Sequence, residues 1–214
     1  MELYLIRHAQ SLNNAGPEQE RVEDPPLTDL GHQQAVHLAR WIPSLKLTRL
    51  ITSPFLRTLQ TTEHIHPPAA LKPQVWRQLH EHGGCVAGPS PDVMVGRPGM
   101  TRAEIESRFP AFDVGAEIDG DGWWKSRPYE TLDEACHRAA KLLARTRDEL
   151  AGTDERVGYV THGGFTPLLI ECFHPVPLEV PRNTSVTKID VTPDTTRLNY
   201  YDRVEHLPAH LISR

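Results

Sequence analysis

The chain has few of the features that mark disulfide scaffolds, membrane proteins or secreted proteins. Its 214 residues include only three cysteines, an odd number at widely separated positions: Cys85, Cys136 and Cys172. Such spacing favours reduced thiols over a disulfide framework or a zinc knuckle. No apolar run approaches the length of a membrane span, and the N-terminus lacks the basic start and apolar stretch of a signal peptide. These absences predict a cytoplasmic protein that does not bind a membrane.

A basic excess is missing as well. The formal net charge is -5 and the isoelectric point is near 6.2, so no global positive field attracts nucleic acid. Any phosphate site must therefore be built from a few local arginines. The composition, with 38% hydrophobic and 24% charged residues, is that of a globular protein. The length suits a single α/β domain over residues 1–214, and no feature indicates an oligomeric state.

Short apolar runs alternate with amphipathic segments, which is the order of a doubly wound α/β fold. Strands are expected at 3–6, 50–52, 75–76, 156–161, 186–191 and 198–203. Helices are expected at 29–42, 55–65, 131–150 and around 168–173. The sequence therefore predicts three layers, α/β/α, in which helices cover both faces of a mostly parallel sheet.

Several helix boundaries carry capping signals. Thr28 suits an N-cap, and Thr101 and Thr131 each stand three residues before a glutamate, which is the spacing of a capping box. Ser53-Pro54 predicts an N-cap followed by a proline at the first helical position. Pro67-Pro68 predicts that the same helix stops just before them.

Residues 85–129 are rich in glycine and proline, and we expect them to form a lid-like insertion that folds over the sheet edge. This segment contains few apolar residues. Trp123 and Trp124 are expected to pack this insertion, with stacking on a substrate as the alternative. Four basic residues are expected to be surface charges, with contact to an acidic substrate as the alternative: Arg97, Arg102, Lys125 and Arg127.

Charged side chains follow the predicted strands at the points where the strands end. Arg7 and His8 follow the first strand, Arg57 lies early in the helix after the second, and Glu81 and His162 follow two later strands. In a mainly parallel sheet these ends meet at one edge, where open α/β sheets bind ligands. An arginine fork matches phosphate oxygens, and a neutral histidine is a nucleophile or proton carrier near pH 7. The pattern favours a site for phosphoryl transfer over isolated surface charges.

Two segments with paired histidines are candidate metal ligands: His80-Glu81-His82 and His64-Ile65-His66. Metal sites need three or four ligands that converge in space. Neighbouring histidines in a chain with 12 of them are commonly surface residues. The sequence therefore favours a site without a metal.

The same residues resemble the histidine phosphatase superfamily, also called the phosphoglycerate mutase-like family, over nearly the whole chain. The segments that carry the resemblance are Arg7-His8-Ala9, Asn14, 27–35, 53–61, Leu79-His80-Glu81, 161–164 and Asn183-Thr184-Ser185. The resemblance implies a phosphoglycerate mutase-like fold and an enzyme that acts on phosphate monoesters without a metal or other cofactor.

The resemblance also implies a role for each site residue. His8 would attack phosphorus and form a phosphohistidine, which requires its other ring nitrogen to donate to a fixed acceptor such as a backbone carbonyl. Arg7, Arg57 and a cationic His162 would hold the phosphoryl oxygens, and Asn14 would add a neutral donor. Glu81 would be the general acid for the leaving alcohol and then the general base for water. The expected site therefore has six residues: Arg7, His8, Asn14, Arg57, Glu81 and His162.

Departures from the family pattern favour a phosphatase over a mutase. The mutases usually carry an Arg-Phe-x-Gly-Trp segment after the pocket asparagine, and this chain has none after Asn14. Mutases also follow the acid with an Arg-x-Tyr-Gly pattern that holds a carboxylate, whereas Glu81 is followed by His82-Gly83-Gly84. We expect the two glycines to leave space for water or for varied leaving groups.

Two other functions stay open. One is a cofactor-dependent phosphoglycerate mutase that grips its substrate from the insertion. The other is an inactive module that binds a phosphorylated ligand in the same pocket. The substrate class also stays open between sugar phosphates, nucleotides, phosphoglycerates and phosphoproteins.

Overall fold

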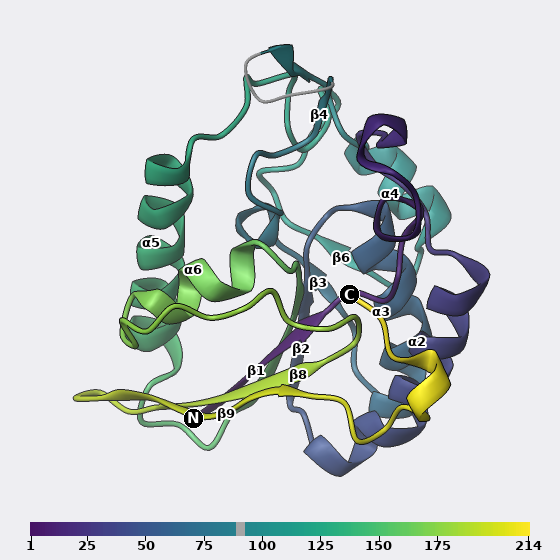
Figure 1. The fold of residues 1–214 in the computed structure, drawn as a ribbon. Helices are drawn as coiled ribbons and strands as arrows, with labels where there is room; N and C mark the ends of the chain where they lie inside the picture. The colour runs from purple at the N-terminus through teal and green to yellow at the C-terminus, as the bar shows by residue number, and fades with distance from the viewer. Residues whose placement is uncertain (89–92) are drawn as a thin grey trace.

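The computed structural model describes residues 1–88 and 93–214 and centres on a seven-stranded sheet (Figure 1). Its spatial order is β6 (Asp113–Val114), β3 (Gln74–Val75), β2 (Arg49–Thr52), β7 (Arg156–Thr161), β1 (Glu2–Arg7), β8 (Val186–Val191) and β9 (Thr196–Arg203). The strands from β6 to β1 pair in parallel, and β8 pairs antiparallel with both β1 and β9. Parallel strands run in the same direction, so the carboxyl ends of β1, β2 and β7 lie at the same edge of the sheet.

Helices cover both faces of this sheet, as Figure 1 shows. One face carries α2 (Asp29–Trp41) and α3 (Leu56–Ala69), and the other carries α5 (Leu132–Leu150) and α6 (Phe165–Glu171). Strand β1 has side chains in both cores: Leu3 and Leu5 pack with α5 and α6, whereas Tyr4 and Ile6 pack with α2 and α3. Alternation of apolar side chains along a strand buried on both faces explains why the run 3–6 is apolar throughout.

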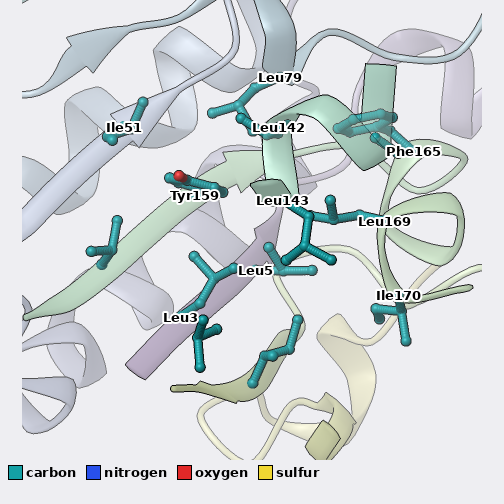
Figure 2. Packing of buried hydrophobic residues seen from close by; sticks show 14 of the residues in the cluster. Leu3, Leu5, Ile51, Leu79, Leu142, Leu143, Tyr159, Phe165, Leu169 and Ile170 are labelled. Atoms are coloured by element: carbon teal, nitrogen blue, oxygen red, sulfur yellow. The ribbon is translucent and has the colours of Figure 1, made fainter. Parts of the chain in front are cut away.

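Figure 2 shows the core on the α5 and α6 side, where Leu142 and Leu143 of α5 and Leu169 of α6 meet Leu5 and Tyr159 of the sheet. This packing fixes the positions of β1 and β7, and therefore the positions of the residues that directly follow these strands. No helix among the described residues is long and apolar enough to cross a membrane.

The expected boundaries of α3 are wrong at both ends. The helix begins at Leu56 with Phe55 as its N-cap, and it continues through Pro67 and Pro68 to Ala69. Asp24 replaces the expected serine cap, because its Oδ1 accepts a hydrogen bond from Leu56 N at 2.8 Å. The two prolines lie in the last turn, where each removes one backbone N–H donor and the helix ends directly after them. The expected caps at Thr28, Thr101 and Thr131 are confirmed.

The segment 85–129 contributes more to the core than its sequence suggested. It includes β4 (Val86–Ala87), β5 (Val95–Gly96), α4 (Arg102–Arg108) and the edge strand β6. Ile105, Phe109 and Trp123 belong to a buried cluster that includes Leu59 of α3 and Val75 of β3. The expectation of thin apolar content is therefore wrong, because few but large side chains supply the buried surface. The lid-like role of the segment stays a prediction.

Candidate active site

The parallel register brings the predicted site residues to one edge of the sheet. Arg7 at the end of β1 pairs with Thr161, and Thr52 of β2 pairs with Val160, so the residues that follow these strands are neighbours. A small cavity of about 130 Å³ opens there, and its lining includes Phe55, Arg57 and Glu81.

His8 is fixed in one orientation and is nearly inaccessible, with 3% of its surface exposed. Its Nδ1 lies 2.7 Å from the carbonyl oxygen of Ala9, which can only accept, so Nδ1 carries the proton. Nε2 is left with a free electron pair and accepts a hydrogen bond from Arg57 Nε at 3.3 Å. Burial, followed by the charges of Arg57 and Arg7, holds the pKa of His8 well below its usual value. The ring is therefore a neutral imidazole whose Nε2 can act as a nucleophile.

A second set of contacts holds the backbone of His8. Its carbonyl oxygen accepts hydrogen bonds from Asn183 Nδ2 at 3.2 Å and from Thr184 N at 3.3 Å. Asn183 is fully buried, and its Oδ1 accepts from Ser213 Oγ at 3.0 Å. Sequence analysis assigned no role to Asn183 beyond its place in a motif. The structure makes it an anchor between the chain end and the β1 terminus.

The two arginines are buried cations without a carboxylate in direct contact. Arg7 donates from Nη1 to the carbonyl of Pro181, while its buried Nε has no partner among the described residues. Burial lowers the pKa of Arg7 to about 10, although the charge of Glu81 opposes this shift. Arg57 lies over the ring of Phe55, with Cζ at 4.1 Å from the ring centre, and burial lowers its pKa too. An unpaired buried N–H favours binding of an anion at this point.

Gly163 lets the chain pass close to the Arg7 guanidinium. A Cβ built at this position would lie 3.0 Å from Arg7 Nε. A larger residue would therefore displace Arg7 or block the approach of an anion to it.

His162 is held by a residue that sequence analysis assigned to helix capping. Its Nε2 lies 2.7 Å from Ser53 Oγ, and its buried Nδ1 has no partner in the described part of the chain. Burial, with added effects of Arg57 and His8, holds the pKa of His162 well below its usual value. Burial thus favours the neutral form of His162 in the ligand-free protein, and the cationic form expected beside a bound phosphate stays a prediction. Ser53 orients the ring, and a bound phosphate dianion would favour its protonation.

Glu81 is oriented by two backbone amides. Oε1 accepts from His82 N at 2.9 Å, and Oε2 accepts from Gly164 N at 3.1 Å. The negative charge of Glu81 opposes the lowering that burial causes in the pKa values of Arg7 and Arg57, and the side chains of Glu81 and Arg57 line the same cavity. The structure thus places the expected acid beside the expected phosphate ligands.

The expectation that Gly83 and Gly84 leave open space holds only in part, since Gly84 lines the small cavity and Gly83 does not. Both have positive φ, 90° and 81°, and form the turn after Glu81. A Cβ at Gly83 would lie 2.7 Å from the ring of Tyr129, and one at Gly84 would collide with Trp124. The glycines are needed for the turn and for packing of these rings. Packing is likewise the role of Trp123 and Trp124, which are 0% and 3% exposed.

Asn14 lies near His8 through its contact with Asn183. Its Oδ1 accepts from Ser11 N at 3.1 Å and from Ser11 Oγ at 3.0 Å, and it lies 3.5 Å from Asn183 Nδ2. The oxygen is thereby occupied, and Nδ2 makes no hydrogen bond within the described residues. The amide N–H groups stay free to donate, and the expected donation to a phosphate remains a prediction.

None of the four basic residues expected in the insertion lines the cavity. Arg102 supports the insertion, with donors at 2.7 to 3.0 Å from the carbonyls of Val114, Gly115 and Ile118. Lys125 pairs with Asp119. Sequence analysis missed three residues that do line the cavity, Arg21, Val22 and Glu23. They lie in a polar segment without periodicity, and no sequence signal indicated that it folds over the site.

The histidine pairs considered as metal ligands point to other partners. His64 Nε2 lies 3.1 Å from His32 Nδ1, and His66 packs on Phe112 with ring centres 5.5 Å apart. Buried His80 has Nδ1 at 2.8 Å from the Glu81 carbonyl. Residues 1–88 and 93–214 contain no group of three or more His, Cys, Asp or Glu side chains placed to hold a metal ion.

We expect acidification to destabilise the protein. Burial holds the pKa values of His8, His80 and His162 well below 6.5 and lowers that of His206 to about 4. Below pH 6.5 the unfolded chain therefore binds protons that the folded chain does not. Asp24 opposes this loss, because burial raises its pKa to about 7. The free energy of unfolding should fall by about 3.5 kcal/mol between about pH 7.5 and 5.5 in phosphate-free buffer.

The Asp24→Asn variant removes the opposing group and should increase that loss by about half. Urea titrations at the two pH values measure both quantities. A free energy of unfolding that stays constant or rises on acidification would contradict the neutral state of the four rings.

Comparison with known proteins agrees with this geometry at the level of family. A family model described as histidine phosphatase superfamily (branch 1) matches residues 3–203. A probable phosphoglycerate mutase GpmB from Photorhabdus laumondii is 26% identical over 196 residues, covering 89% of this chain and 85% of the relative. A glucosyl-3-phosphoglycerate phosphatase from Mycolicibacterium vanbaalenii is 25% identical over 185 residues, covering 83% and 76%.

Solved structures agree at the level of fold. The mycobacterial glucosyl-3-phosphoglycerate phosphatase in complex with VO3 superposes with a TM-score of 0.65 at 21% identity, covering 95% of this chain and 99% of that chain. A phosphoserine phosphatase variant from Entamoeba histolytica gives a TM-score of 0.64 at 18% identity, covering 97% and 99%. The expected three-layer α/β/α architecture is confirmed.

Proposed function

The chain belongs to the histidine phosphatase superfamily, and we propose that it hydrolyses small phosphate monoesters through a phosphohistidine on His8, without a metal ion. The observation that carries this proposal is the fixed imidazole of His8. Its proton is held on Nδ1 by the Ala9 carbonyl, and its Nε2 faces Arg57. Among the relatives are proteins named as phosphatases as well as mutases, so family alone does not select the reaction.

In the first step, the Nε2 electron pair of His8 forms a bond to phosphorus while the ester P–O bond breaks. Arg7, Arg57 and His162 bind the oxygens on which charge accumulates. Glu81 gives its proton to the departing alcohol oxygen. The phosphorylated ring carries a positive charge, which the Ala9 carbonyl stabilises through the Nδ1–H bond.

In the second step, Glu81 takes a proton from a water molecule whose oxygen attacks phosphorus. The P–N bond breaks, inorganic phosphate leaves, and His8 returns to its neutral form while Glu81 is again protonated. One carboxyl group serves both steps because each needs a proton transferred on the same side of the phosphorus.

The small cavity supports a compact substrate. Its volume of about 130 Å³ is below the range of about 300–1,000 Å³ that drug-sized ligands occupy. Arg21 and Glu23 both line it, so it offers charges of both signs beside the phosphate ligands. This combination favours small, polar phosphomonoesters over a phosphoprotein.

The main alternative is a phosphoglycerate mutase. We expect phosphate release from several small phosphomonoesters and negligible interconversion of 2- and 3-phosphoglycerate. The test runs a coupled mutase assay with bisphosphoglycerate beside a phosphate-release assay, each with and without EDTA. Mutase turnover above phosphate release would overturn the phosphatase assignment, and activity lost in EDTA but restored by zinc or manganese would overturn the metal-free mechanism. An inactive binding module would show neither activity.

A further inference from the structure

A second and larger cavity lies on the other side of the segment that carries Glu81. It has a volume of about 540 Å³ and lies between α5, the segment 77–80 and the segment 124–130. Among the described residues, it shares no lining residue with the candidate active site. We call this cavity the α5 groove.

The α5 groove is basic although the chain is acidic overall. Two acidic residues line it, Glu130 and Glu134, against five basic ones: Arg77, Arg127, Arg138, Lys141 and Arg145. The whole chain carries a net charge of -5. Positive charge concentrated in a concave site focuses the local potential and attracts anions.

The two carboxylates of the groove are already occupied. Glu130 is buried and accepts two hydrogen bonds from Arg138, at 2.7 and 2.6 Å. Glu134 accepts from the backbone N and the hydroxyl of Thr131, at 2.8 and 2.9 Å, as part of the helix cap. Neither carboxylate therefore pairs with the remaining cations of the groove.

Three cations of the groove have no ion-pair partner in the part of the chain that the structure describes: Arg77, Arg127 and Lys141. The charges of Arg77 and Arg127 both act on His80, a buried lining residue. Their guanidinium groups are planar forks that match phosphate and carboxylate oxygens. Arg145, in contrast, pairs with Glu149 at 2.7 Å. Arg127 lies over the ring of Trp124, with Cζ at 5.4 Å from the ring centre.

We propose that the α5 groove binds a small polyanion with at least two phosphate or carboxylate groups, held by Arg77, Arg127 and Lys141. The volume is within the range of about 300–1,000 Å³ found for small-molecule sites. Separate cations spaced around a concave site suit several anionic groups better than one. This site goes beyond the proposed function and does not depend on it.

The site adjoins the segment that presents Glu81. Arg138 Nη1 donates to the carbonyls of Gln78 and His80, at 2.7 and 3.0 Å, so the groove wall and the Glu81 segment are one hydrogen-bonded unit. An anion bound in the groove rests against this unit.

The test counts binding sites by isothermal titration calorimetry, with tripolyphosphate and citrate as separate probes. We expect two sites for tripolyphosphate in the wild type, one in the active site and one in the groove. Arg57→Ala should keep the groove site only. Arg77→Gln/Lys141→Gln should weaken the groove site at least about tenfold and keep the active site. Citrate separates a general polyanion site from one that needs phosphate groups.

The matched control is Arg40→Gln/Lys72→Gln, which also removes one arginine and one lysine charge, both at exposed positions outside the groove. It should bind like the wild type. Equal weakening in the control would reduce the effect to net charge and overturn the site, as would tripolyphosphate binding that Arg77→Gln/Lys141→Gln leaves unchanged. A dimer in sedimentation that the groove variant abolishes would show that a second copy occupies the groove, and would overturn the proposal too.

Discussion

Replacement of His8 by alanine is expected to lower phosphate release by a factor on the order of 10⁴ or more. Within the described residues, the imidazole nitrogen that contacts a buried guanidinium group at this sheet edge is His8 Nε2. It lies 3.3 Å from Arg57 Nε. Without it, water must attack the ester directly, and the reaction loses its division into two easier displacements. Phosphate release from a small alkyl phosphate measures the effect.

The variant should still fold and bind an anion, because Arg7 and His162 keep their hydrogen-bond partners and Arg57 keeps its contact with the Phe55 ring. Vanadate or phosphate binding by calorimetry and circular dichroism check both points. Wild-type enzyme quenched in denaturant at alkaline pH should hold a phosphoryl group that is labile in acid and stable in base, and His8→Ala should hold none. His37→Ala, on helix α2 away from the site, is the matched control and should keep full activity. More than a few per cent of wild-type activity in His8→Ala would exclude the phosphohistidine route.

The positions of the site residues could be predicted because they depend on strand ends. A parallel sheet fixes where its carboxyl ends meet, so Arg7, His8 and His162 follow from recognition of two apolar strands. The orientation of those side chains could not be predicted in the same way. It depends on contacts between segments far apart in the chain, such as Ser53 with His162 and Asn183 with the His8 carbonyl.

Errors in the sequence interpretation have the same physical origin. The cap of α3 comes from Asp24, 32 residues before the N–H that it accepts, whereas capping rules look only at neighbours. Gly83 and Gly84 are consistent with open space or with a tight turn until the rings of Tyr129 and Trp124 are placed. The α5 groove joins residues from three segments, and no local motif marks it.

Replacement of Glu81 by glutamine is expected to separate substrates by their leaving groups. An alkyl alcohol leaves poorly unless it receives a proton, so the first step should slow about 10²- to 10³-fold for an alkyl phosphate. The p-nitrophenolate ion leaves without a proton, and its first step should slow less than about tenfold. Glutamine keeps the size of Glu81 and one acceptor oxygen for His82 N or Gly164 N, but it carries no transferable acidic proton.

Rapid-quench measurements separate this step from the next. With p-nitrophenyl phosphate the variant should show a burst of nitrophenolate followed by a slow steady state, because hydrolysis of the phosphohistidine still needs Glu81 to deprotonate water. The accumulated phosphoenzyme should be measurable as acid-labile phosphate. Glu23→Gln is the matched control, since Glu23 also lines the cavity and has no assigned proton transfer; it should show neither the burst nor the dependence on the leaving group. Equal slowing of both substrates in Glu81→Gln would assign the acid to another residue, while His8 and the arginines would keep their roles.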